Sequence, residues 1–321
     1  MQAYRAPAWL PGGHAQTIWA ASFARRDSGQ PAGFVRERWT TPDGDFIDVD
    51  VQPGAAAAPW LVVFHGLEGS SGSHYVQAFA WAARAAGLNF AAPHFRGCSG
   101  ELNRAPRAYH SGDFEEVGWI LAQLRKRSAA PLLAVGVSLG GNALLRWAEE
   151  AGSGAAACTA AVAAVCSPID LAAGGRALCR GFNRQVYGRL FLRSMKPRAL
   201  AKLDQHPGLF DRQRLLASRD LYEFDNVFTA PLHGFANTDD YWARASAKPL
   251  LYTIRIPTLV LNARNDPFVP AWCLPAASDV GRHVTLWQPP HGGHVGFAAG
   301  APPGHVLGMP QAVLDWLRAH A

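Results

Sequence analysis

The stretch whose residue types could do the most definite chemistry is Gly-Val-Ser-Leu-Gly at residues 136–140. An apolar strand-like run, 131–135, precedes it, and a helical pattern, 142–150, follows it. At such a strand-to-helix turn the residues two positions before and after the serine must lack bulky side chains, because glycine alone avoids the Cβ clash and accepts unusual backbone angles. The turn therefore presents Ser138 clear of its strand as a candidate nucleophile.

A serine attacks well only when a histidine takes its proton and a carboxylate holds that histidine. Asp266 follows the apolar run 257–262, and His294 follows the run 283–287. The carboxyl ends of parallel strands meet at one edge of a sheet, where active sites of open α/β sheets lie. The order serine, acid, histidine therefore predicts a triad of Ser138, Asp266 and His294.

Two members of this set also have a plain structural interpretation. Asp266 could be a turn residue before Pro267, and His294 could be a packed loop histidine with His291 as the base instead. The two histidines have an i, i+3 spacing, but their Gly-Gly loop lacks further metal ligands at convincing spacing. Three residue types in the required order favour the triad, with His294 as its base and without a metal.

The negative charge of a tetrahedral intermediate requires backbone N–H donors. We expect one from Leu139, the residue after the nucleophile, and the other from Leu67 in the loop 65–69. The helix that begins near Leu139 adds the positive end of its dipole. His65 is expected to set the shape of the loop.

The elements that must position these residues alternate between apolar strands and helical patterns, which predicts an α/β fold with a mostly parallel central sheet and helices on both faces. The expected strands are 34–39, 46–51, 60–64, 88–93, 131–137, 159–166, 257–262 and 283–287, and the expected helices are 73–86, 113–127, 140–150, 270–280 and 310–320.

One segment, approximately 169–250, interrupts the alternation because it is rich in helix formers and contains no clear buried strand. We interpret it as a helical cap inserted into a single domain that spans 1–321. Its first part is basic, with eight cations and no acid between 171 and 203: Arg176, Arg180, Arg184, Arg189, Arg193, Lys196, Arg198 and Lys202. That part carries +8 while the whole chain carries +6, so the basicity is local.

Within the cap, arginines recur every four residues from 176 to 184, and apolar residues recur every four from 178 to 190. On a helix these two sets lie on opposite faces, although Gly181 and Gly188 weaken the helix and could divide it. We expect the apolar face to form an acyl pocket, and the cations of 176–202 to meet an anionic membrane surface weakly. The alternative is a solvated arginine face.

Composition sets broader limits. The chain has 321 residues, 49% hydrophobic and 17% charged, as a globular protein does. Its five cysteines are scattered, its first residues lack the pattern of a signal peptide, and no apolar run approaches the ~18 residues of a membrane span. A cytoplasmic protein is predicted. The glycine turn at 136–141 lacks the dinucleotide-binding spacing, so no cofactor is expected, nor is a nucleic-acid partner.

Six motifs together resemble the YheT-type α/β-hydrolases, and the N-terminal sequence Pro-Gly-Gly-His-Ala-Gln-Thr at 11–17 resembles that family's signature. The motifs lie at 64–70, 94–100, 109–113, 136–142, 265–268 and 291–297. The resemblance implies an α/β-hydrolase fold and a serine hydrolase with the triad Ser138, Asp266 and His294. It also implies acyl-ester substrates, since eukaryotic relatives act on phospholipids and medium-chain ethyl esters, some as acyltransferases.

The predicted function is therefore hydrolysis of carboxylic esters, with short- to medium-chain or lipid acyl groups, through an acyl-enzyme. Two alternatives stay open. An alcohol O-acyltransferase would use the same acyl-enzyme, and a non-catalytic binding module could use the same fold.

Overall fold

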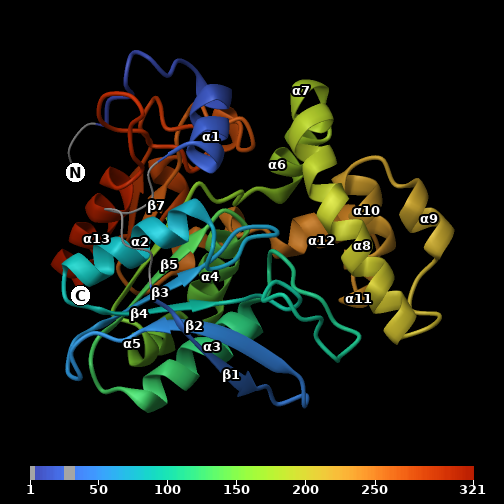
Figure 1. Cartoon of the computed structure of the whole chain (residues 1–321), viewed down its shortest axis with the longest axis horizontal. Coiled ribbons are helices and arrows are strands. Elements are labelled where there is room, and N and C mark those ends of the chain that lie inside the picture. The colour runs from blue at the N-terminus through green and yellow to red at the C-terminus, as the bar shows by residue number, and fades with distance from the viewer. Residues whose placement is uncertain (1–3, 25–32) are drawn as a thin grey trace.

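Eight strands form one central sheet in the order β1-β2-β4-β3-β5-β6-β7-β8 (Figure 1). The structure is a computed structural model that describes residues 4–24 and 33–321. β2 is antiparallel to β1 and β4, and all other neighbouring strands are parallel. The strands are β1 Val35–Thr40, β2 Phe46–Gln52, β3 Trp60–Phe64, β4 Asn89–Pro93, β5 Leu132–Val137, β6 Ala161–Val165, β7 Thr258–Leu261 and β8 Val284–Trp287.

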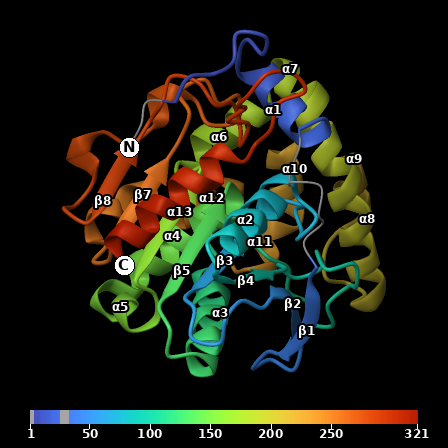
Figure 2. The ribbon, with the colours of Figure 1, turned by 60° about the vertical axis from the view of Figure 1, so that its left-hand side comes forward.

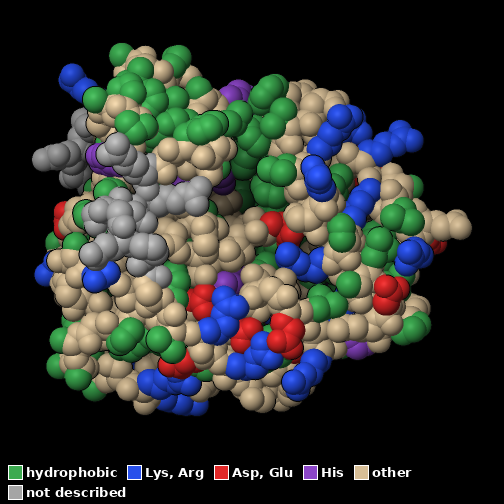
Figure 3. Space-filling model, in the orientation of Figure 1, with side chains coloured by type: hydrophobic (Ala, Val, Ile, Leu, Met, Phe, Trp, Pro, Cys, Tyr) green, Lys and Arg blue, Asp and Glu red, His purple; other side chains and the backbone are tan. Residues whose placement is uncertain are grey.

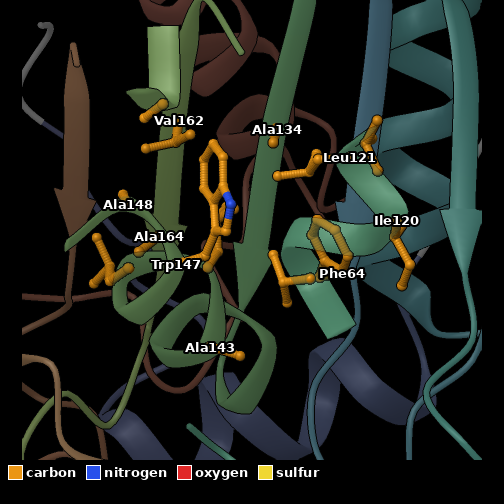
Figure 4. Packing of buried hydrophobic residues seen from close by; sticks show 14 of the residues in the cluster. Phe64, Ile120, Leu121, Ala134, Ala143, Trp147, Ala148, Val162 and Ala164 are labelled. Carbon is orange, nitrogen blue, oxygen red and sulfur yellow. The ribbon is translucent and has the colours of Figure 1, made fainter. Parts of the chain in front are cut away.

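Helices cover both faces of this sheet, which explains why its central strands are almost wholly apolar (Figure 2). On one face, strand residues such as Phe64 pack against Ile120 of α3 and Trp147 of α4 (Figure 4). On the other face, Val135 packs in a cluster with residues of α2 and α13. The predicted α/β class, mostly parallel with helices on both sides, is confirmed.

The helices outside the insertion are α1 Gly13–Ser22, α2 His74–Ala85, α3 Phe114–Arg127, α4 Leu139–Ala151, α5 Ala155–Cys158 and α13 Gly308–His320, with a short turn η1 Gly152–Gly154. In the described residues 4–24 and 33–321, no helix is both long and apolar enough to cross a membrane.

Between β6 and β7 the chain forms a second group of helices in the segment where a cap is expected, and Figure 1 shows α8 to α12 beside the sheet. They are α6 Leu171–Leu178, α7 Gly181–Asn183, η2 Arg184–Gly188, α8 Arg189–Gln205, α9 Arg212–Ala217, α10 Leu221–Val227, α11 Thr229–Leu232, α12 Thr238–Ala245 and η3 Lys248–Thr253.

The helix predicted at 270–280 is wrong. The connection from β7 to β8 contains two short turns instead, η4 Ala271–Cys273 and η5 Ala277–Asp279, with Leu274 extended between them. Pro275 lacks the N–H that a helix would use, and it disfavours helical geometry in the residue before it.

The cap helix predicted through 176–190 is divided. α6 ends at Leu178, and Gly181 has a φ of +48° that a continuous helix does not allow. The chain then restarts through α7 and continues through the π-type turn η2 into α8, so the second glycine, Gly188, lies inside the helical run.

This division also changes which face is buried. Phe182, Val186 and Leu190, which we expected at an acyl pocket, are 53%, 38% and 63% exposed. The helical phase does not continue across the break, so the restarted helix turns Phe191 and Met195 inward instead. The expectation that the repeating apolar set lines the pocket is wrong for these three residues.

Candidate active site

Ser138 occupies a tight turn between β5 and α4. Its backbone angles, φ 53° and ψ −120°, are ones that residues with side chains rarely adopt. A Cβ added at Gly136 would lie 2.4 Å from the Gly140 oxygen, and one at Gly140 would lie 2.4 Å from the His65 oxygen. Both glycines are therefore required by close backbone packing, as the sequence motif predicts.

The structure brings Ser138, Asp266 and His294 together in one hydrogen-bonded chain. The Ser138 hydroxyl lies 3.0 Å from His294 Nε2, and His294 Nδ1 lies 2.8 Å from Asp266 Oδ2. With a proton on Nδ1, the histidine donates to the carboxylate and accepts from the serine. This arrangement can remove the serine proton and stabilise the resulting imidazolium.

The buried Asp266 carboxylate is held from its other side as well. Oδ1 accepts hydrogen bonds from the N–H groups of Phe268 at 2.7 Å and Val269 at 3.3 Å, which leaves Oδ2 for His294. The ring of Phe268 lies 4.2 Å, centroid to centroid, from the imidazole. The acid and the ring plane of the base are therefore both fixed by the short loop after β7.

The alternative base, His291, is not among the residues that line the cavity at Ser138. It is exposed, and its Nδ1 is 3.5 Å from Asn265 Nδ2. Within the described residues, the set that could be considered for a metal is Cys166, Asp266 and His294, whose ligand atoms lie within 4.8 Å of one another. The Cys166 thiol is buried and hydrogen-bonds to the Gly293 oxygen and the Val295 N–H, while Asp266 and His294 hydrogen-bond to each other.

The loop 65–69 after β3 packs directly against the nucleophile, since a Cβ at Gly66 would lie 3.1 Å from Ser138 Cβ. In the described part of the chain, the N–H groups of Leu67 and Leu139 are not hydrogen-bonded to a protein acceptor. Both expected oxyanion donors are thus available beside the serine.

His65 holds the loop 65–69 in place through two hydrogen bonds. Its Nδ1 donates to the Gly66 oxygen at 2.8 Å, and its Nε2 accepts from the Phe95 N–H at 3.0 Å. Burial lowers the pKa of His65 to about 3, so the ring is neutral and can play both parts. The structural role expected for it fits these contacts.

Glu68, the residue after Leu67, connects the same loop to the cap. Its φ is +57°, and its carboxylate Oε1 accepts hydrogen bonds from Tyr109 at 2.9 Å and from Arg198 of α8 at 2.7 Å. The Tyr109 oxygen in turn accepts from the Glu68 N–H at 2.9 Å. An unusual backbone conformation beside an oxyanion donor is therefore held partly by a cap residue.

An apolar cavity opens from Ser138 and His294 into the space between sheet and cap, with an empty volume of about 1190 Å³ that includes its open part. Figure 3 shows the surface of this face with a hollow between the sheet side and the cap side. Half of the residues that line it belong to the cap, and these include eight large apolar or aromatic side chains: Leu171, Leu178, Phe191, Met195, Leu221, Phe224, Phe228 and Trp242. A hydrocarbon chain attached to a carbonyl at the serine would fit such a lining.

Sequence reasoning missed Gln16 and Thr17. Both lie on α1 and hydrogen-bond to the loops that carry Asp266 and His294. Both residues belong to the motif at 11–17, which we used only for the family resemblance and to which we assigned no function.

Comparison with known proteins gives this fold and site a family. The family model of the alpha/beta hydrolase fold matches residues 59–301. YheT of Escherichia coli (strain K12) is 37% identical over 313 residues, covering 96% of this chain and 90% of that protein. The chain belongs to the α/β-hydrolase family, among its YheT-type members.

More distant relatives match most of the chain and share its fold. Human phospholipase ABHD3 is 25% identical over 332 residues, covering 99% of this chain and 79% of that protein. Among solved structures, alpha/beta hydrolase domain-containing protein 10 from mouse has a TM-score of 0.57 at 13% identity, covering 89% of this chain and 98% of that one, which supports the fold. Because its relatives include an esterase, a phospholipase and the monoacylglycerol lipase of Saccharomyces cerevisiae, the chain is a carboxylic ester hydrolase.

Proposed function

We propose that the protein cleaves acyl esters through an acyl-enzyme on Ser138. His294 takes the hydroxyl proton while the serine oxygen attacks the ester carbonyl, and Asp266 stabilises the imidazolium. The N–H groups of Leu67 and Leu139 hold the oxyanion. His294 then protonates the leaving alcohol, and water repeats the sequence to release the acid. The hydrogen-bonded chain at 3.0 and 2.8 Å is the observation that carries this proposal.

The test is turnover of p-nitrophenyl esters of several chain lengths by the wild type and by Ser138→Ala. Wild-type turnover by the variant would refute the proposal. If ethanol added to the reaction yielded ethyl esters in place of the free acid, the protein would be an acyltransferase through the same intermediate.

The substrate we propose is an ester of a medium-chain or longer acyl group, such as a lipid. The apolar lining contributed by the cap supports this choice, because burying each CH₂ group of a chain contributes about 0.8 kcal/mol. We expect kcat/KM to rise from acetyl to octanoyl esters. Equal values across that range would show that the cavity does not receive the acyl chain.

We also propose that the cap meets an anionic membrane surface through the exposed cations among 176–202. Two of the predicted cations take no part: Lys202 is buried, and Arg198 is bonded to Glu68. The exposed stripe of Phe182, Val186 and Leu190 supports this, with Arg189 and Arg193 exposed beside it. Figure 3 shows hydrophobic side chains near α7, with Lys and Arg side chains beside them on the cap. Apolar side chains that enter the interface and cations that stay with anionic head groups are the combination found in interfacial helices.

Vesicle co-sedimentation tests this second proposal. We expect binding to vesicles that contain anionic lipid, weaker binding to neutral vesicles, and loss of binding in Phe182→Ser/Leu190→Ser. Equal binding to both kinds of vesicle, or none, would remove the cationic contribution. Concentration-dependent dimerisation that the double variant abolishes would assign the stripe to a second copy of the chain instead.

A further inference from the structure

The N-terminal helix α1 lies directly against the two loops that carry the acid and the base. Thr17 Oγ1 accepts a hydrogen bond from the His294 N–H at 2.8 Å and donates one to the Gly13 oxygen at 2.7 Å. A single hydroxyl therefore fixes the backbone of His294 to the first turn of α1.

Gln16 of the same helix joins the other loop to this one. Its side chain is buried, and its Oε1 accepts from the Gly292 N–H at 3.0 Å and from Asn265 Nδ2 at 3.1 Å. Its Nε2 donates to the Leu10 oxygen at 3.0 Å, so both ends of the amide are used. Because Asn265 precedes Asp266, the Gln16 side chain bridges the acid loop and the base loop, which are also joined directly by the hydrogen bond from the Gly293 N–H to Asn265 Oδ1 at 2.9 Å.

The glycines of these motifs show how closely the three segments pack. A Cβ at Gly13 would lie 1.9 Å from the Asn265 oxygen, and one at Gly293 would lie 2.7 Å from the Gly13 oxygen. A Cβ at Gly296 would lie 2.7 Å from the Gln16 oxygen. The atoms that such a Cβ would meet belong to the backbone, which cannot rotate aside as a long side chain can. The position of α1 relative to both loops is therefore fixed by close backbone packing.

We infer that Thr17 and Gln16 are positioning residues, which hold His294 and Asp266 at their distances from Ser138. The inference rests on the proposed function, since it assigns a part to the N-terminal motif in the same reaction. Neither side chain is needed to bind substrate: neither lines the cavity. Their loss therefore lowers kcat and leaves KM nearly unchanged, because the interaction matters only when the proton moves.

The test uses the full chain and isosteric changes. Thr17→Val keeps the shape and removes the hydroxyl, Thr17→Ser keeps the hydroxyl, and Gln16→Met keeps the length and removes both loop contacts. Thr40→Val, at an exposed position on β1, is the matched control. Each variant is assayed for kcat and KM on one p-nitrophenyl ester, with its folded fraction measured by thermal unfolding.

We expect Thr17→Val and Gln16→Met to lower kcat about 10- to 100-fold, because small displacements of a catalytic group have effects of that size. Thr17→Ser and Thr40→Val should stay within about twofold of the wild type. The inference is overturned if Thr17→Val matches Thr40→Val, if Thr17→Ser is as slow as Thr17→Val, or if KM alone changes. It is also overturned if neither Thr17→Val nor Gln16→Met folds, because the role would then be structural only. Ser138→Ala is assayed in the same experiment. If it keeps its activity, the proposed function is wrong, whereas an inactive Ser138→Ala with a fully active Thr17→Val overturns the inference alone.

Discussion

Asp266→Asn should be the most damaging change that leaves the shape of the site intact. In the wild type, Asp266 Oδ1 accepts from two backbone N–H groups, of Phe268 and Val269, while Oδ2 faces His294 Nδ1 at 2.8 Å. Asparagine has one oxygen and one NH₂ group. The two backbone donors select the oxygen, so the NH₂ group must face the imidazole.

An NH₂ group at that position can only donate, which forces His294 to leave Nδ1 bare and to carry its proton on Nε2. That tautomer cannot accept the proton of Ser138. A change of tautomer of this kind lowers kcat about 10⁴-fold, which corresponds to about 5 kcal/mol of activation free energy.

The assay is kcat on a p-nitrophenyl ester at neutral pH, with thermal unfolding of the same samples. Asp204→Asn is the control, since that carboxylate is 75% exposed on the cap. A folded Asp266→Asn variant that keeps more than about a tenth of wild-type kcat would refute the claim that this carboxylate sets the tautomer.

Three further changes probe other parts of the structure. Arg198→Ala should lower kcat about 10-fold or more by releasing Glu68 beside the oxyanion loop, and a Glu68→Gln/Arg198→Ala double variant that adds no further loss in kinetic assays would show that the two act as a pair. Gly140→Ala should lower the free energy of unfolding by about 3 kcal/mol in urea titrations, because its Cβ would meet the His65 oxygen at 2.4 Å; an unchanged midpoint would contradict this packing. Burial raises the pKa of Asp225 from 3.8 to about 6, so the folded state disfavours the charged form and stability should fall as pH rises through about 4 to 6. Melting curves across that range should show a smaller fall in Asp225→Asn, and an equal fall would exclude this carboxyl as the cause.

Much of the site could be predicted because its residues have sharp local signatures. Ser138 lies between two glycines that only a tight turn requires, and Asp266 and His294 each follow an apolar run that is a strand. The fold class followed from the same alternation, because strands covered on both faces are apolar throughout.

The features that sequence could not supply depend on contacts between distant segments. Residues of α1 reach His294 across more than 270 positions of the chain, and no local pattern reports such a contact. The prediction of an apolar pocket face in the cap was wrong for another reason. The chain breaks before Gly181 and the helix restarts in a different orientation, so the apolar residues before and after the break do not share one helical face. The predicted helix 270–280 fails for a local reason, because Pro275 lies inside it and lacks the N–H that a continuous helix needs.

The measurement that most directly tests the account is peptide mapping by mass spectrometry of the enzyme quenched in acid during turnover of a p-nitrophenyl ester. The account predicts the mass of one acyl group on Ser138 in the wild type and no acyl group anywhere in Ser138→Ala. An acyl group on another residue of the turning-over wild type, or steady turnover by Ser138→Ala, would contradict it.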